Sequence, residues 1–151
     1  MSAELDELYQ SIILDQNRRP QNFRAMESST GHADGVNPMC GDQVTVWVKL
    51  NGDTLEDVSF QGQGCSISKA SASLMTAAIK GKTKAEAEKL FDDFHDLITG
   101  KTDGASMGRL KAFGGVFRFP LRVKCASLAW HAMKSALETG AGTLSTEPHE
   151  G

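Results

Sequence analysis

The stretch VTVWVKLNGDTLEDVSF, residues 44–60, decides the fold. Apolar side chains recur at alternate positions before and after an asparagine–glycine pair, and a period of two is typical of strands that bury one face. The pair itself, Asn51–Gly52, is typical of the tight turn of a β-hairpin. The sequence therefore predicts an antiparallel hairpin whose strands cover about residues 44–50 and 55–60.

Helical patterns flank this hairpin on both sides. In the segments given at the end of this paragraph, apolar side chains recur with a period near 3.6, which is typical of helices. Thr83 and Glu86 also match a capping box, a pattern that begins a helix. Residues 20–42 are rich in Gly, Asn, Ser and Pro, which favours an irregular connection that contains at most a short edge strand. The predicted helices cover residues 3–18, 66–79, 83–100, a short stretch around 107–113, and the segment after Pro120.

These elements predict an α+β fold, with a small antiparallel sheet of two to three strands packed against several helices. We expect a single domain over residues 1–139. The remaining residues, 140–151, are polar and rich in glycine, so a disordered C-terminal tail is expected there.

Composition limits the classes of function. The chain has 151 residues, a net charge of -3 and a pI near 5.8, which argues against a partner that is nucleic acid or an anionic membrane. No apolar run approaches the roughly 20 residues that span a bilayer, and the N-terminus lacks a signal-peptide core, so we expect a cytoplasmic protein. Thiols stay reduced in the cytosol, and three cysteines cannot all pair internally. Metal binding or thiol chemistry is therefore favoured over disulfides.

The three cysteines fall where the predicted elements meet. Cys40 precedes the first strand of the hairpin and Cys65 follows the second, so the hairpin brings them together. Cys65 also begins a helix, where free N–H groups favour a thiolate. Cys125 lies early in the last helix, on its apolar face. Together with Asp42, these thiols make a possible set of four metal ligands.

The types of ligand narrow the choice of metal. Three thiolates and one carboxylate suit Zn²⁺, or iron in an iron–sulfur cluster. A zinc site of this composition carries a net charge near -2, which keeps a bound thiolate nucleophilic. Cys40 is the ligand best placed to leave, and Arg122 and Lys124 flank Cys125 and could offset the negative charge. Two histidines were weighed as further candidates: His131 as an alternative ligand and His32 for a transient role.

Three motifs that contain these cysteines resemble those of a known family. They are NPMCGD (37–42), FQGQGCSISKASASLMT (60–76) and RVKCASLAWHAM (122–133). They resemble the cysteine motifs of the IscU/NifU N-terminal superfamily, which serves iron–sulfur cluster assembly. The resemblance runs from about Leu8 to Leu137 and implies an IscU/SufE-like fold.

Three features resemble one branch of that superfamily, the SufU proteins, which transfer sulfur in a zinc-dependent manner in the SUF pathway. IscU scaffolds carry a histidine immediately before the third cysteine, where this chain has Lys124. They also carry an LPPVK chaperone-docking motif, where this chain reads FRFPLRVKC. The stretch between Cys65 and Cys125 is longer than in IscU by about one short helix.

The resemblance implies that Cys40, Asp42, Cys65 and Cys125 hold Zn²⁺. It further implies that a SufS-type cysteine desulfurase, which carries pyridoxal phosphate, docks beside the metal and that one of its histidines replaces Cys40. Cys40 then accepts persulfide sulfur for the downstream SUF scaffold complex, and Arg122 matches an arginine that assists near the metal. The alternative is a scaffold that assembles a [2Fe–2S] cluster on the same ligands. A third possibility is a binding module whose zinc only holds the fold together.

Overall fold

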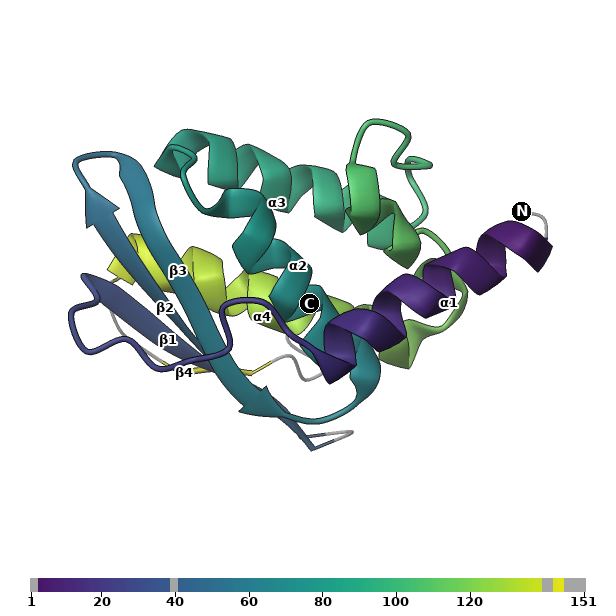
Figure 1. Cartoon of the computed structure of the whole chain (residues 1–151), viewed down its shortest axis with the longest axis horizontal. Coiled ribbons are helices and arrows are strands. Elements are labelled where there is room, and N and C mark those ends of the chain that lie inside the picture. Colours follow the sequence, from purple (N-terminus) through teal and green to yellow (C-terminus); the bar gives the residue numbers. More distant parts are fainter. Residues whose placement is uncertain (1–2, 39–40, 140–142, 146–151) are drawn as a thin grey trace.

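The computed structural model describes residues 3–38, 41–139 and 143–145 (Figure 1). Four α-helices, two 3₁₀ helices (η1 and η2) and four strands are described in this part of the chain. In chain order they are α1 Ala3–Arg18, β1 Gly31–Asn37, β2 Asp42–Asn51, β3 Thr54–Gln63, α2 Ser66–Ile79, α3 Lys84–Ile98, η1 Gly108–Phe113, η2 Val116–Arg118, α4 Pro120–Thr139 and β4 Thr143–Ser145.

The hairpin predicted from residues 44–60 is confirmed as β2 and β3, which pair antiparallel from Gln43↔Gln63 to Asn51↔Thr54. Gly52 lies in the turn between them with a φ of 62°, a backbone conformation that suits glycine. The order of strands in the sheet is β3-β2-β1-β4.

Residues 20–42 contain more regular structure than the sequence indicated. β1 is a seven-residue strand that pairs antiparallel with β2 and lies inside the sheet, between β2 and β4. Its sequence, GHADGVN, has few residues with high strand propensity. The strand forms because β2 offers its second row of backbone hydrogen-bonding groups to this segment. The pairing places Asn37 opposite Asp42, at the end of the hairpin where the cysteines were expected to meet.

The segment predicted to be a disordered tail includes three described residues, Thr143–Ser145, which form β4 parallel to β1. For these three residues the prediction of disorder is wrong, because β1 presents an open edge of backbone groups that a further strand can pair with. The rest of the predicted tail, 140–142 and 146–151, lies outside the described residues. That residues 1–139 form one domain stays a prediction.

The helices confirm the expected α+β class. Thr83 and Glu86 form the capping box of α3, with the Glu86 N–H donating to Thr83 Oγ1 at 3.1 Å and the Thr83 N–H donating to Glu86 Oε1 at 3.0 Å. The short helix expected around 107–113 is η1. Among the described helices, none combines the length and the apolar character needed to cross a membrane.

One face of the sheet packs against the helices and the other faces outward. α4 lies across β1 and β2, and α2 packs against β3 and α4 (Figure 1). Val44, Val46 and Val48 of β2 point into this core, where the ring of Trp130 stacks on Phe94 at a centroid distance of 4.4 Å. Trp130 is therefore a core residue.

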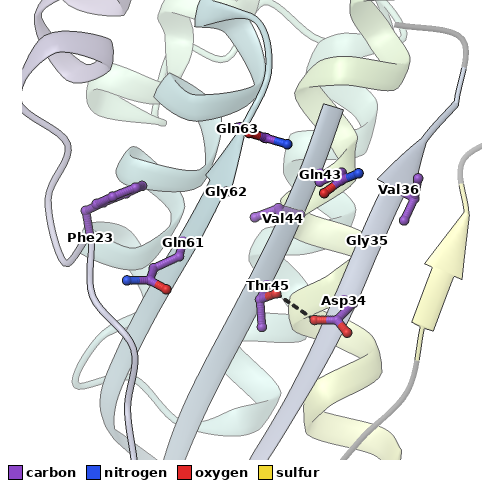
Figure 2. Close-up of a pocket in the computed structure, with 10 residues that line it drawn as sticks. All are labelled: Phe23, Asp34, Gly35, Val36, Gln43, Val44, Thr45, Gln61, Gly62 and Gln63. Carbon is purple, nitrogen blue, oxygen red and sulfur yellow. Dashed lines mark hydrogen bonds between the residues drawn. The ribbon is translucent and has the colours of Figure 1, made fainter. Parts of the chain in front are cut away.

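The outward face carries polar side chains and an open groove of about 640 Å³ (Figure 2). Thr45 and Asp34 lie side by side on its floor, with Thr45 Oγ1 donating to Asp34 Oδ1 at 2.6 Å. Glutamine side chains from β2 and β3 and the ring of Phe23 complete the lining. Most side chains that line the groove occupy outward-facing positions of β1, β2 and β3, although the buried Val44 also borders it.

Candidate metal centre

Asp42, Cys65 and Cys125 converge at one end of the sheet. Their ligand atoms, one carboxylate oxygen and two sulfurs, all lie within 4.8 Å of one another. Asp42 is the first residue of β2, Cys65 caps the N-terminus of α2, and Cys125 lies in the second turn of α4. The hairpin thus brings Asp42 to Cys65, and α4 adds Cys125; the sequence predicted that the hairpin brings Cys40 to Cys65, and that pair stays a prediction. Cys40 lies outside the described residues, two positions before Asp42 in the chain.

Asp42 is fully buried and held in place by the residue that it faces. Its Oδ1 accepts a hydrogen bond from the backbone N–H of Cys65 at 2.8 Å, and its Oδ2 lies 3.6 Å from Cys65 Sγ. Gly64 makes this approach possible, because a Cβ at that position would collide with the Asp42 carboxylate. Its φ of 147° is also a conformation that other residues rarely adopt. The glycine before Cys65 is therefore part of the site.

Cys65 has a thiol that ionises readily. A hydrogen bond from the Cys125 thiol lowers its pKa to about 7, and the backbone N–H groups of Ser68 and Ile67 at the start of α2 act in the same direction. Burial and the negative charge of Asp42 oppose them by raising the pKa. The balance brings ionisation of this thiol into the neutral pH range, and a thiolate is the form that binds metals.

A buried hydrogen-bonded bridge fixes α2 against α4 behind the two cysteines. Ser71 Oγ donates to the backbone oxygen of Ala126 at 2.6 Å, and it accepts from Trp130 Nε1 at 3.0 Å. Ser71, Ala126 and Trp130 are all buried, so water does not compete for these bonds. Because Ala126 follows Cys125 directly, the bridge sets the distance between the helix that carries Cys65 and the helix that carries Cys125.

The geometry of these residues fits a tetrahedral metal ion. With Zn–S and Zn–O distances of about 2.3 Å and 2.1 Å, a tetrahedral ion separates a thiolate and a carboxylate ligand by about 3.6 Å. The observed distance between Cys65 Sγ and Asp42 Oδ2 is 3.6 Å. Two sulfurs and one carboxylate oxygen suit zinc, and they also suit iron. The described residues thus supply three ligands, and Cys40 is the candidate for the fourth.

Comparison with known proteins places this centre in a family. Residues 8–126 match the family model described as the NifU-like N terminal domain. The chain belongs to this family. It is 43% identical over 138 residues to the zinc-dependent sulfurtransferase SufU of Bacillus subtilis (strain 168), an alignment that covers 90% of this chain and 93% of that protein. The resemblance inferred from the three cysteine motifs is thereby confirmed.

Other members of the NifU-like family are also similar to this chain. The iron–sulfur cluster assembly scaffold protein IscU of Streptococcus pyogenes serotype M1 is 39% identical over 147 residues, covering 92% of this chain and 88% of that protein. Among solved structures, a protein from Fervidobacterium islandicum AW-1, described as an iron–sulfur cluster assembly scaffold for the SUF system, superposes with a TM-score of 0.81. It is 34% identical, and the match covers 87% of this chain and 98% of that one. These solved relatives confirm the expected IscU-like α+β fold.

Arg122 lies on the same side of α4 as Cys125, because residues three apart on a helix are neighbours. It is exposed, and its guanidinium lies 4.9 Å from the centre of the Phe119 ring. The structure thus places Arg122 within one helical turn of Cys125, a candidate ligand. Its catalytic role stays a prediction.

The two histidines weighed from the sequence lie away from the centre. The ring of His131 packs on Phe91 at 5.1 Å, and burial against α3 lowers its pKa. His32 belongs to β1 and is exposed on the outward face of the sheet. Neither belongs to the group of neighbouring ligand atoms found among the described residues.

Sequence reasoning missed the residues that position the ligands. Gly64 was interpreted as part of a strand end, although its place directly before Cys65 could have indicated a close backbone approach. Ser71 and Trp130 gave no signal beyond an apolar helical stripe with small residues, because their hydrogen bond joins positions 59 residues apart.

Proposed function

We propose that this chain is a zinc-dependent sulfurtransferase of iron–sulfur cluster assembly, and that Cys40 accepts sulfur from a SufS-type cysteine desulfurase. The observation that carries the proposal is the convergence of Asp42, Cys65 and Cys125, whose ligand atoms lie within 4.8 Å of one another, with Cys65 Sγ and Asp42 Oδ2 at the 3.6 Å expected around a tetrahedral ion. The name of the Bacillus subtilis relative, a zinc-dependent sulfurtransferase, supports the same function.

Zinc would be held by Asp42, Cys65 and Cys125, with Cys40 as the fourth ligand. When bound, zinc keeps cysteine ligands deprotonated at neutral pH and therefore nucleophilic. Asp42 is suited to remain in place, because it is buried and already hydrogen-bonded to the Cys65 backbone. Cys125 is buried in α4, and Cys65 is fixed at the start of α2, so neither sulfur can move far.

The described residue next to Cys40 lies in open surroundings, unlike the three other candidate ligands. The residue that follows it, Gly41, is exposed with a φ of 73°, and no atom lies within 4 Å of the position that a Cβ would occupy there. Open space on this turn supports access by a partner to Cys40. In the transfer step, the Cys40 thiolate attacks the outer sulfur of the persulfide on the desulfurase. The S–S bond of that persulfide breaks, a new S–S bond forms on Cys40, and the desulfurase cysteine leaves as a thiolate.

The partners follow from this chemistry. A pyridoxal-phosphate cysteine desulfurase makes the persulfide from free cysteine, and the SUF scaffold complex would receive the sulfur from Cys40. Arg122 would offset the negative charge of three thiolates and one carboxylate during transfer. The reaction needs reduced thiols, so we place it in the cytoplasm.

Metal analysis and peptide mapping test the proposal. Trypsin separates the three cysteines onto the peptides 25–49, 50–69 and 125–134. Protein purified without added iron should contain one zinc per chain and be colourless. After incubation with the desulfurase and cysteine, the added sulfur should appear on peptide 25–49. Cys40→Ala should keep zinc, with water as the fourth ligand, but lose both the sulfur adduct and the stimulation of the desulfurase.

Two results would contradict this function. Stoichiometric iron with acid-labile sulfide and visible absorption, in protein purified anaerobically, would establish the alternative, a scaffold that carries a [2Fe–2S] cluster on the same ligands. Sulfur on peptide 50–69 or 125–134, with Cys40→Ala still active, would show that the acceptor was assigned to the wrong cysteine.

A further inference from the structure

A short exposed segment precedes the helix that carries Cys125. Residues 117–122, with the sequence FRFPLR, are all exposed and join η2 to the first turn of α4. Phe117, Phe119 and Leu121 are 45%, 50% and 49% exposed, and they are three of the five large hydrophobic side chains exposed in the described part of the chain. We call residues 117–122 the Phe–Arg patch. Exposed apolar side chains gathered in this way are typical of protein interaction sites.

The patch is basic, although the chain as a whole is acidic. Its two charged residues are Arg118 and Arg122, and the sequence from Gly104 to Leu137 contains no aspartate or glutamate in a chain with a net charge of -3. The sequence around the patch is therefore free of the acidic side chains that are common elsewhere in the protein. Such a surface complements a partner that presents carboxylates.

Both arginines stack on aromatic rings of the same segment. The guanidinium carbon of Arg118 lies 5.6 Å from the centre of the Phe117 ring, and that of Arg122 lies 4.9 Å from the centre of the Phe119 ring. Phe117 also lies against Gly100, where its ring would meet a Cβ at 3.0 Å. These contacts restrict the rings and guanidinium groups before binding, which lowers the entropy lost when a partner docks.

The patch adjoins the metal centre. Leu121 and Arg122 lie four and three residues before Cys125 on α4, so both are neighbours of Cys125 on the surface of the helix. The exposed first turn of α4 therefore borders the buried Cys125, so a partner docked on the patch would lie next to the candidate metal centre.

We propose that the Phe–Arg patch is the docking surface for the cysteine desulfurase, through an apolar site on that enzyme with acidic residues at its rim. This inference rests on the proposed function, because the desulfurase is the partner that must approach the centre. Phe119 and Leu121 supply apolar contact area, and Arg118 supplies charge at the edge of the patch. The groove on the outward face of the sheet (Figure 2) also contains an exposed aromatic ring, Phe23, but its lining includes the carboxylate of Asp34 and no arginine, so it suits an acidic partner less well.

Binding measurements with matched variants test the inference. Phe119→Ser and Leu121→Ser change the apolar part of the patch, and Arg118→Glu reverses a charge. Leu14→Ser is the apolar control, because Leu14 on α1 is 46% exposed, and Lys82→Glu is the charge control, an exposed lysine between α2 and α3. The zinc-loaded full chain and the purified desulfurase are titrated by calorimetry, with zinc content and melting temperature recorded for every variant.

Each patch variant should raise the Kd about tenfold or more, as is typical when a central interface residue is replaced. The two controls should stay within about twofold, because their side chains lie outside the patch. Arg118→Glu should also reduce the dependence of binding on salt, since it removes a charge–charge attraction. At saturating concentrations of Leu121→Ser and Arg118→Glu, desulfurase stimulation and the sulfur adduct on Cys40 should return to wild-type levels, because these two variants weaken docking and leave Arg122 and its stacking partner Phe119 in place. Phe119→Ser is used for the binding measurement alone.

Three outcomes would overturn the inference. If the wild type binds the desulfurase and accepts sulfur while the patch variants bind equally well, docking occurs elsewhere and the proposed function stands. If the patch variants abolish self-association of the wild type without changing desulfurase affinity, the patch joins two copies of this chain. If the wild type neither binds the desulfurase nor accepts its sulfur, the proposed function fails together with this inference.

Discussion

The backbone N–H of Cys65 donates a hydrogen bond to Asp42 Oδ1 at 2.8 Å, across the open end of the β2–β3 hairpin. The other carboxylate oxygen, Oδ2, lies 3.6 Å from Cys65 Sγ. One side chain thus uses one oxygen to hold the start of α2 and places the other oxygen beside the sulfur of Cys65, a candidate metal ligand. Different substitutions of Asp42 should therefore separate its hydrogen bond to the Cys65 backbone from its proposed bond to the metal.

Asp42→Asn and Asp42→Ala should have different effects. Asparagine keeps an oxygen that can accept a hydrogen bond from the Cys65 N–H, so metal-free Asp42→Asn should retain most of the wild-type stability. The same substitution removes the negative charge that favours zinc, so zinc affinity should fall. Alanine removes the hydrogen bond as well, and a buried N–H left without its acceptor costs about 1–3 kcal/mol. Urea unfolding of the metal-free proteins and zinc competition titrations measure both effects. Wild-type zinc affinity in Asp42→Asn would show that the carboxylate is not a ligand.

Gly64→Ala should disrupt the centre, and Gly81→Ala provides a matched control. Both glycines have a positive φ, 147° and 85°, so alanine is strained at either position by about 1 kcal/mol. Only at Gly64 would the added Cβ collide with the Asp42 carboxylate, whereas nothing lies within 4 Å at Gly81. We expect Gly64→Ala to lose zinc and Gly81→Ala to keep it, as measured by metal content after dialysis. Equal zinc content in the two variants would contradict the role assigned to this close approach.

Ser71→Ala should weaken the bridge between α2 and α4. It leaves the buried Trp130 Nε1–H and the Ala126 oxygen without the hydroxyl that they share, which should lower the free energy of unfolding by about 1–3 kcal/mol. Ser127→Ala is the control, because its hydroxyl bonds only within α4, to Lys124 O at 3.2 Å. Thermal unfolding gives the comparison, and a zinc titration should show reduced affinity for Ser71→Ala alone. A Ser71→Ala protein as stable as Ser127→Ala would mean that the bridge contributes little.

The metal-free protein should become more stable as pH rises from about 7 to 9. The pKa of Cys65 is lowered from the ordinary 9.0 to about 7, so the folded state loses this proton before the unfolded state does. The contribution is therefore fully present above the unfolded pKa and is lost as pH falls through about 7. Urea unfolding in the presence of a chelator, compared between the wild type and Cys65→Ser, measures it. Parallel pH profiles for the two proteins would contradict the lowered pKa.

Arg122→Ala should slow sulfur transfer without affecting folding. Arg122 is exposed, and its described interactions are with the Phe119 ring and within the first turn of α4, so zinc content and melting temperature should match the wild type. The maximal rate of transfer at saturating protein should fall, because a positive charge near the thiolates is removed, and Arg122→Lys should restore part of it. This differs from the behaviour expected of Arg118→Glu, whose maximal rate should be unchanged.

The sequence by itself determined the elements whose signals are local. The alternation around Asn51–Gly52 predicted the hairpin, the Thr83–Glu86 pair predicted the start of α3, and both are confirmed. It also predicted that Cys40 and Cys65 meet, because a hairpin joins its own open ends, and the described residue at that end of the first strand, Asp42, does lie beside Cys65. For Cys125 the apolar face of the last helix was sufficient to place the thiol in the interior.

Tertiary structure alone decided the rest, because the partners lie far apart in the chain. β1 is a strand although GHADGVN has little strand propensity, since β2 supplies its hydrogen bonds, and β4 forms because β1 then presents an edge. The bond between Ser71 and Trp130 spans 59 residues, and that between Asp42 and Cys65 spans 23. Local sequence patterns cannot specify such pairs. Each of these residues fits the helix or strand that contains it equally well whether or not its hydrogen-bond partner is present elsewhere in the chain. The distance between the cysteines depends on these long-range contacts.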